Sequence, residues 1–167
     1  MKNIVLIGFM GSGKTFVSAV LGRKLKRPVI STDQLIEQKE GMSVADIFKK
    51  HGEAYFREKE EEVVQRIAGG QGAIIDGGGG VVINLKNIAA LKKNGVLFYL
   101  WASPEFLYKT IALNKDRPLM QVKDPMEQIK KMLKEREKFY NQADYKIVSE
   151  HKKIEEIADD IIKLIDK

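Results

Sequence analysis

The chain has 167 residues, 44% of them hydrophobic and 31% charged, with no cysteine and a formal net charge of +6 at pH 7. These values exclude a disordered or fibrous chain, a disulfide framework and a thiolate zinc site, and the length predicts one domain over residues 1–167. Basic residues are interleaved with acidic ones and no apolar run reaches roughly 20 residues, so we expect a cytoplasmic protein with no nucleic-acid or membrane partner.

Short apolar runs bounded by turn residues alternate with stretches of helical periodicity, a pattern typical of an α/β protein with a parallel sheet. Predicted helix N-termini lie at Ser103 before Pro104 and at Asp124 before Pro125, and residues 154–165 predict a terminal amphipathic helix. The five predicted strands cover residues 3–7, 28–31, 73–75, 96–101 and 145–148.

Two segments interrupt this alternation. Residues 41–65 contain two or three helical stretches, separated at Ser43 and Gly52, with no strand between them. Residues 114–124 are polar and charged and contain a proline, which is typical of a mobile surface loop. We expect both segments to be lids or substrate-binding insertions.

A complete phosphate-binding motif follows the first predicted strand and precedes a helical stretch. The backbone N–H groups of such a loop point at phosphate oxygens, and the helix adds the positive end of its dipole. We expect Lys14 to bridge the β and γ phosphates of the nucleotide and Thr15 to place its hydroxyl on Mg²⁺. The motif G-x-x-x-x-G-K-[ST] reads here as Gly8, Phe9, Met10, Gly11, Ser12, Gly13, Lys14 and Thr15.

This loop identifies a nucleotide site but not a reaction. The guanine reader N-K-x-D of GTPases is not matched, because Arg117 stands where its aspartate is needed in the stretch from Asn114. Adenylate kinases usually place glycine after the loop lysine, where this chain has Thr15. The sequence therefore favours a kinase that acts on a small hydroxyl substrate.

Several linked stretches carry a family resemblance. They are STDQLIE at 31–37, GMSVADIF at 41–48, GEAYFREKE at 52–60, the glycine run 77–80, the triplet 117–119, and Arg136 ahead of Tyr140 and Ala143. In order and spacing, from residue 4 to about residue 145, the chain resembles the shikimate kinase family.

The resemblance implies a three-layer P-loop fold similar to that of nucleoside-monophosphate kinases, with a five-stranded parallel sheet of order 2-3-1-4-5. It implies ATP- and Mg²⁺-dependent phosphorylation of the 3-hydroxyl of shikimate, in aromatic amino acid (chorismate) biosynthesis. It also implies a substrate-binding segment at about 33–61 and a lid at about 112–124. We expect a monomer whose partners are the two small-molecule substrates.

Three residues are assigned to the acceptor by this resemblance. Asp33 would orient or deprotonate the attacking hydroxyl, and Arg57 and Arg136 would bind the substrate carboxylate with their planar guanidinium groups. Without the surrounding motifs, Asp33 would be more typical of an N-cap for a helix over residues 34–40. Arg136, flanked by two glutamates, is equally typical of a surface salt bridge. The resemblance favours ligand binding for both.

Other residues would complete the acceptor pocket. Glu60 lies one helical turn from Arg57 and would hold its guanidinium, although a surface pair has the same spacing. Phe48 and Phe56 would line the pocket, or else belong to the core. Close backbone approach to the substrate and donation of N–H groups are expected of Gly77, Gly78 and Gly79.

At the nucleotide, Arg117 would close with the lid and neutralise the transferring phosphoryl group. Lys109 and Lys153 are weaker candidates, for contacts with the adenine and ribose end of the nucleotide. Thr110 stands where the family commonly has an arginine. Besides Lys14, Thr15, Arg117 and Lys153, the expected nucleotide-binding set contains Gly11, Ser12, Gly13 and Phe16.

The predicted metal site departs from the family pattern. Ser31 stands where these kinases usually have an aspartate that helps to hold the water shell of Mg²⁺. Asp76, however, follows the third predicted strand, where a Walker B aspartate would lie. We predict a metal site formed by Thr15 and Asp76; the alternative is that Asp76 only accepts hydrogen bonds from amides of the glycine run.

Two other functions remain open on the sequence. One is a kinase of another small hydroxy acid such as gluconate, which would keep the phosphate loop and change the acceptor arginines. The other is a non-catalytic nucleotide-binding or nucleic-acid-binding module, against which the pairing of Asp33 with Arg136 argues.

Overall fold

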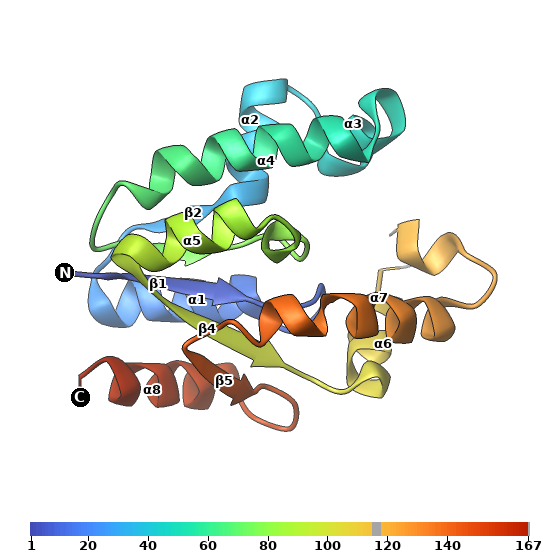
Figure 1. Cartoon of the computed structure of the whole chain (residues 1–167). Helices are drawn as coiled ribbons and strands as arrows, with labels where there is room; N and C mark the ends of the chain where they lie inside the picture. Colours follow the sequence, from blue (N-terminus) through green and yellow to red (C-terminus); the bar gives the residue numbers. More distant parts are fainter. Residues whose placement is uncertain (115–117, 167) are drawn as a thin grey trace.

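A five-stranded parallel sheet with the strand order β2-β3-β1-β4-β5 forms the centre of the computed structural model, which describes residues 1–114 and 118–166 (Figure 1). This order confirms the predicted fold class. Each predicted strand is present, with ends shifted by at most one residue. The strands are β1 Asn3–Ile7, β2 Val29–Ser31, β3 Ile74–Asp76, β4 Gly95–Trp101 and β5 Tyr145–Val148.

Helices cover both faces of this sheet, which makes three layers. The α-helices are α1 Lys14–Leu25, α2 Thr32–Glu40, α3 Val44–His51, α4 Glu53–Ala68, α5 Leu85–Asn94, α6 Pro104–Ala112, α7 Pro125–Tyr140 and α8 Ile154–Ile165. Two short 3-10 helices, η1 Val81–Ile83 and η2 Pro118–Gln121, lie between them.

The alternation of side chains along β1 explains the two covered faces. Val5 and Ile7 point into a cluster that includes residues of α4 and α5, whereas Ile4 and Leu6 point into a cluster with α1 and α8. All four side chains are at most 1% exposed. A strand buried on both faces reads as a continuous apolar run, as this one does.

The helix starts follow local capping chemistry. Ser103 and Asp124 cap α6 and α7 as predicted, accepting hydrogen bonds from the amides of Phe106 and Glu127. The alternative N-cap role of Asp33 is wrong, because the cap of α2 is Ser31, the last residue of β2. Asp33 therefore lies inside the first turn of α2, where its side chain is not needed as a cap.

Both predicted insertions have helical structure. Segment 41–65 contains α3 and most of α4, which pack with α2 through a separate apolar cluster around Ile36, Ile47, Phe56 and Val63, on the β2 side of the sheet (Figure 1). Segment 114–124 contains η2 and the cap of α7, while residues 115–117 lie outside the described part. The loop prediction for 114–124 was therefore wrong at η2.

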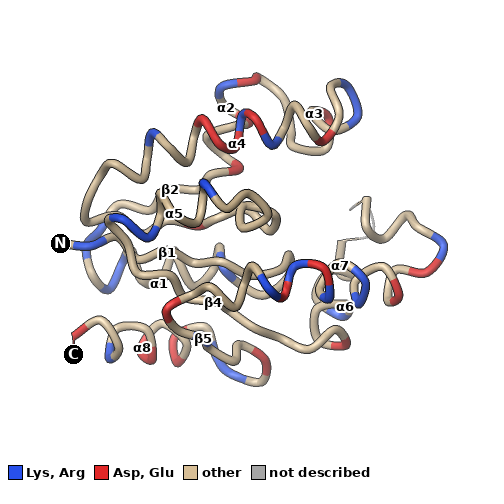
Figure 2. The backbone as a smooth tube through the Cα atoms, viewed as in Figure 1, with Lys and Arg blue, Asp and Glu red and all other residues tan. Residues whose placement is uncertain are grey.

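Charges of both signs are interleaved along α4 and α7 (Figure 2). In the part of the chain that the structure describes, no helix combines the length and the apolar character needed to cross a bilayer.

Candidate active site

The phosphate loop joins β1 to α1. Gly11 and Gly13 have φ values of +83° and +91°, a region that residues with a Cβ rarely adopt, and a Cβ on Gly11 would lie 3.0 Å from Ile111. The Lys14 ammonium donates to the carbonyl oxygens of Gly8 and Phe9 at 2.8 and 3.1 Å. The lysine is thus folded over its own loop, with its charge at the place where phosphates would bind.

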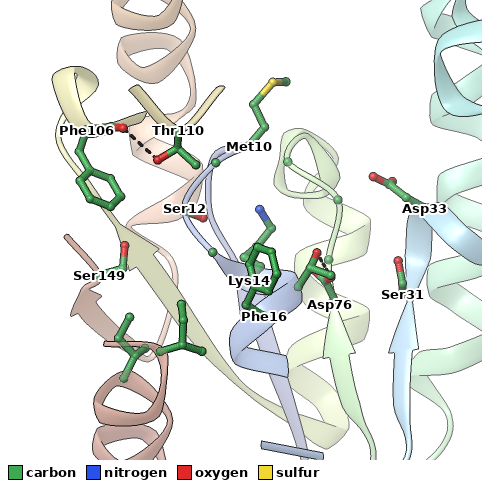
Figure 3. Close-up of a pocket in the computed structure, with 18 of the residues that line it drawn as sticks. Met10, Ser12, Lys14, Phe16, Ser31, Asp33, Asp76, Phe106, Thr110 and Ser149 are labelled. Atoms are coloured by element: carbon green, nitrogen blue, oxygen red, sulfur yellow. Dashed lines mark hydrogen bonds between the residues drawn. The ribbon is translucent and has the colours of Figure 1, made fainter. Parts of the chain in front are cut away.

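A cavity of about 450 Å³ surrounds this loop (Figure 3). On one side lie the ends of β2 and β3 with Ser31 and Asp76, and on the other lie Phe106 and Thr110 of α6. All six residues predicted here from the phosphate loop and the start of α1 line it: Gly11, Ser12, Gly13, Lys14, Thr15 and Phe16.

Lys153, which was expected to contact the nucleotide, does not line this cavity. Its neighbours Lys152 and Ile154 line the cavity, whereas Lys153 does not, and the Lys153 backbone N–H donates to Glu156 at the start of α8. Lys109 is also absent from the lining, and Thr110 is present, with its hydroxyl donating to the carbonyl of Phe106 at 3.1 Å. The position of Thr110 at the nucleotide was expected from the family resemblance, whereas sequence reasoning missed Phe106, the other α6 residue that lines the cavity.

Thr15 and Asp76 meet at the base of this cavity. The Thr15 hydroxyl donates to Oδ2 of Asp76 at 2.8 Å. Asp76 is only 7% exposed; burial raises the pKa of its carboxyl, while the nearby Lys14 ammonium and the Thr15 hydrogen bond act in the opposite direction. The two oxygen ligands predicted for the metal are therefore adjacent.

The alternative role for Asp76, as an acceptor for the glycine run, is not what the structure shows. The amide of Gly77 donates to the carbonyl of Leu6, and the amide of Gly78 donates to the Thr32 hydroxyl. Among residues 1–114 and 118–166, no group of three or more His, Cys, Asp or Glu side chains could hold a metal by itself. Mg²⁺ needs no such cage, because it keeps several waters and binds one or two carboxylates together with substrate phosphates.

A second cavity of about 660 Å³ lies between α3, α4, α7 and the glycine run. It is lined by Asp33, Arg57 and Arg136, the three residues assigned to the acceptor, and also by Phe48 and Phe56. Glu60 and Gly79 also line it, whereas Gly77 and Gly78, predicted for the same pocket, line the cavity around the phosphate loop. The lining residues that sequence reasoning missed include Met10, Glu37, Glu53 and Met132; of these, Glu53 could have been found from its i,i+4 spacing to Arg57.

Arg57 is held by its surroundings on α4. Glu60 Oε1 accepts from its Nη1 at 2.9 Å, which confirms the predicted pair, and Glu60 is only 1% exposed. Burial raises the pKa of the Glu60 carboxyl, and Arg57 acts against that rise. The rings of Phe48 and Phe56 lie 5.9 and 5.3 Å from the guanidinium carbon. A buried ion pair is screened by salt much less than an exposed one, so the pair with Glu60 fixes the orientation of this arginine more strongly than a surface pair would.

Arg136 reaches the same cavity from α7. Its Nη1 donates to the carbonyl of Gly79 at 3.3 Å, and its guanidinium lies over the ring of Phe9 at 5.7 Å. Tyr140 donates to the same carbonyl at 2.5 Å. Within the described ranges Arg136 makes no ion pair of 4 Å or less, so the surface salt bridge considered for it is wrong.

The glycine run matters here because it leaves space for the Asp33 carboxylate, and less because of its N–H groups. Donation to a substrate was expected from Gly77, Gly78 and Gly79, but the amides of the first two are used inside the fold, at Leu6 and Thr32. A Cβ on Gly78 would lie 2.5 Å from Oδ1 of Asp33, closer than real Cβ atoms approach. A side chain at Gly78 would therefore displace the Asp33 carboxylate.

Asp33 lies where the two cavities meet. It lines both of them, together with Met10 and Gly79. Burial raises the pKa of the Asp33 carboxyl, and the Lys14 ammonium acts in the opposite direction. A carboxylate with a raised pKa is a stronger proton acceptor. Arg117, the remaining predicted catalytic residue, lies outside the described residues.

Comparisons with known proteins show the family of the chain. The family model described as shikimate kinase matches residues 10–166. The shikimate kinase of Caldanaerobacter subterraneus subsp. tengcongensis is 49% identical over 98% of this chain and 95% of its own length, and that of Thermoanaerobacter pseudethanolicus is 47% identical over the same shares. The Acinetobacter baumannii shikimate kinase, solved in complex with shikimate, superposes with a TM-score of 0.94 at 33% identity, covering 99% of this chain and 93% of that one. The Aquifex aeolicus shikimate kinase gives a TM-score of 0.87 at 35% identity, covering 98% and 96%.

Proposed function

The chain belongs to the shikimate kinase family, and from this premise we propose how its own residues divide the work of the reaction. The reaction is transfer of the γ-phosphoryl group of ATP to the 3-hydroxyl of shikimate, giving ADP and shikimate 3-phosphate in aromatic amino acid biosynthesis. One observation carries the assignment: Asp33 lies at the junction of the cavity around the phosphate loop and the cavity lined by arginines.

In this assignment, ATP binds with its phosphates on the loop from Gly11 to Thr15. Lys14 exchanges its contacts with the carbonyls of Gly8 and Phe9 for phosphate oxygens, which needs only a small movement of a long side chain. The charge of this lysine then stabilises the negative charge that develops on the transferring group. Arg117 is assigned the same task from the lid.

Shikimate binds in the second cavity with its carboxylate toward Arg57 and Arg136. Both line that cavity, and a planar guanidinium can bind a carboxylate through two parallel hydrogen bonds. Asp33, at the other end, accepts a hydrogen bond from the 3-hydroxyl, directs its oxygen at the phosphoryl group and takes up its proton. The raised pKa of Asp33 supports this role.

We assign the divalent metal to Mg²⁺, held by Thr15 and Asp76. The donor set fits this ion, because it consists of one hydroxyl and one carboxylate beside the phosphate loop. When bound, Mg²⁺ would neutralise phosphate charge and polarise the transferring group. Asp76 would act through the water shell of the ion.

We further propose that residues 1–167 form one kinase domain acting as a cytoplasmic monomer on ATP and shikimate. Segments 33–61 and 112–124 would be its substrate-binding part and its lid. The absence of cysteine suits a reducing compartment.

An assay of ADP release with shikimate, quinate, gluconate and nucleoside monophosphates tests the assignment. We expect the highest kcat/KM for shikimate, the acceptor of the family to which the chain belongs. Nucleoside monophosphates lack the carboxylate that the two arginines would bind, so we expect the lowest values for them. A higher kcat/KM for gluconate would favour the hydroxy-acid kinase considered above. Absence of turnover with every acceptor would favour the non-catalytic nucleotide-binding module.

A further inference from the structure

Arg57 has two carboxylate partners of different character in this structure. Glu60 is 1% exposed and pairs with Nη1 at 2.9 Å. Glu53 is 61% exposed, and one oxygen, Oε1, accepts weakly from both Nη2 and Nε, at 3.3 and 3.4 Å. The first pair is short and buried, whereas the second is long and open to solvent.

The rest of the guanidinium is covered. The rings of Phe48 and Phe56 lie near it, and a Cβ on Gly80 would overlap with its nitrogens, which shows that the chain at Gly80 is in close contact with it. Glu60 holds Nη1. Among the described residues, Glu53 is the only solvent-exposed partner of Arg57 for which the structure gives a hydrogen bond.

The edge that Glu53 occupies is one on which a carboxylate can bind. Nε–H and one N–H of Nη2 point in parallel, and a carboxylate can accept both bonds with its two oxygens. Glu53 uses only one oxygen for the two donors. A ligand carboxylate in this cavity could therefore make better bonds there than Glu53 does, but it must first displace Glu53.

We propose that Glu53 is an internal substitute for the substrate carboxylate: it pairs with Arg57 while the acceptor cavity is empty and leaves when an acidic acceptor binds. This inference rests on the proposed function, because it takes the ligand of Arg57 to be the carboxylate of shikimate. Glu53 is then a residue that weakens acceptor binding, whereas Glu60 strengthens it.

Displacement of Glu53 has a low cost for two reasons. Its exposed carboxylate regains water when it leaves Arg57. As the first residue of α4, it also remains at the positive end of the helix dipole. The side chain can therefore rotate outward without creating a buried unpaired charge.

Glu53→Gln removes the competing charge and keeps the size of the side chain. An exposed ion pair of this kind contributes little, so we expect the Kd of shikimate, measured by calorimetry without ATP, to fall roughly two- to fivefold. The Kd of methyl shikimate, a neutral ester that need not displace Glu53, is expected to stay within error of its wild-type value. Glu58→Gln, the same charge change on the exposed side of α4 away from the cavity, is the control and should change neither value.

Weaker or unchanged binding of shikimate to Glu53→Gln, in a variant whose melting temperature equals that of the wild type, overturns the inference. Glu53→Ala serves as the second variant if the glutamine still holds Arg57, and the same direction of change is expected. Failure of the wild-type protein to bind shikimate at all would instead refute the proposed function together with the inference. An equal fall in Kd for the methyl ester would show that Glu53 acts on the cavity in general, which also contradicts the proposal.

Discussion

Ser31 and Asp76 are register partners across the parallel pair of β2 and β3, and each is the last residue of its strand. A carboxylate at either position would therefore stand at the same edge of the sheet, beside the phosphate loop. In this chain the acid is on β3, and Ser31 uses its hydroxyl to cap α2. The proposed metal site therefore uses Asp76 of β3, because β2 carries no carboxylate at the paired position.

The first prediction concerns magnesium. Asp76→Asn should raise the Mg²⁺ concentration for half-maximal rate, by on the order of 10- to 100-fold, because an outer carboxylate is lost. Adding Ser31→Asp should partly restore it, since an aspartate at this position is adjacent in register and still caps α2. Rates measured against free Mg²⁺ check this. An unchanged titration in Asp76→Asn would leave Thr15 as the only protein group assigned to the metal.

Asp33→Asn tests the proposed role of Asp33 in orienting and deprotonating the acceptor hydroxyl. The change keeps the size of the side chain but removes the charge that orients the acceptor hydroxyl, and we expect kcat to fall ~10²- to 10⁴-fold. The affinity for ATP, measured by calorimetry, should stay near its wild-type value. Turnover close to that of the wild type would show that the position of Asp33 between the cavities has no catalytic consequence.

The raised pKa of Asp33 predicts a pH dependence. As pH falls, kcat/KM should decline at a pH above the usual range of aspartate, and this acid limb should be absent from the residual activity of Asp33→Asn. Stability should change in the opposite sense. The folded state binds this proton more tightly than the unfolded state, so the contribution of Asp33 to stability is present at low pH and lost as pH rises through its folded pKa.

At neutral pH the ionised Asp33 therefore destabilises the fold. We expect Asp33→Asn to melt at a higher temperature than the wild type at pH 7, with a difference that shrinks on acidification. Thermal unfolding at several pH values measures both effects. A variant that melts lower at pH 7 would contradict the predicted sign.

Arg136→Lys tests the carboxylate site. The change keeps the charge and loses the planar pair of donors, so the KM for shikimate should rise while the KM for ATP stays the same. Arg66→Lys, an exposed arginine on α4 outside the acceptor cavity, is the control. Arg117→Ala should lower kcat more than it weakens acceptor binding. Identical kinetic profiles for the Arg136 and Arg117 variants would contradict the division of roles.

Gly78→Ala tests whether catalysis requires the Asp33 carboxylate to stay in its present position beside Gly78. The new Cβ would lie 2.5 Å from the Asp33 carboxylate, and we expect a large loss of kcat/KM for shikimate with little change in ATP binding. Gly69→Ala is the matched control, because its Cβ would meet only ordinary contacts, the nearest at 3.8 Å. Equal activities of the two variants would show that Asp33 can move without consequence.

Features that depend on neighbouring residues were predicted well from the sequence. The strands follow apolar runs, and the caps at Ser103 and Asp124 follow from a side chain and an amide three residues apart. The pair of Arg57 and Glu60 follows from one helical turn. Errors arose where two residues compete for one local role, as at Asp33 and Ser31, since only the end of β2 decides which of them caps α2.

The hydrogen-bond partners of individual backbone amides also could not be predicted from the sequence. Gly77 and Gly78 look like free donors in a glycine run, but their N–H groups bond to Leu6 on β1 and to Thr32 on α2, which are distant in the chain. Similarly, Lys152 and Ile154, the neighbours of Lys153, line the nucleotide cavity at the start of α8, a helix that packs against α1.

By itself, the sequence determined the phosphate loop, the set of strands and the family, because each rests on residue types at short, fixed spacings. Only the tertiary structure decided that Thr15 meets Asp76 and that Asp33 stands between the two cavities. It also decided that Arg57 and Arg136 line one of these cavities from different helices. The physical reason is the strand order: with β3 beside β1 and β2 beside β3, the carboxyl ends of three parallel strands bring together groups that are distant in the chain.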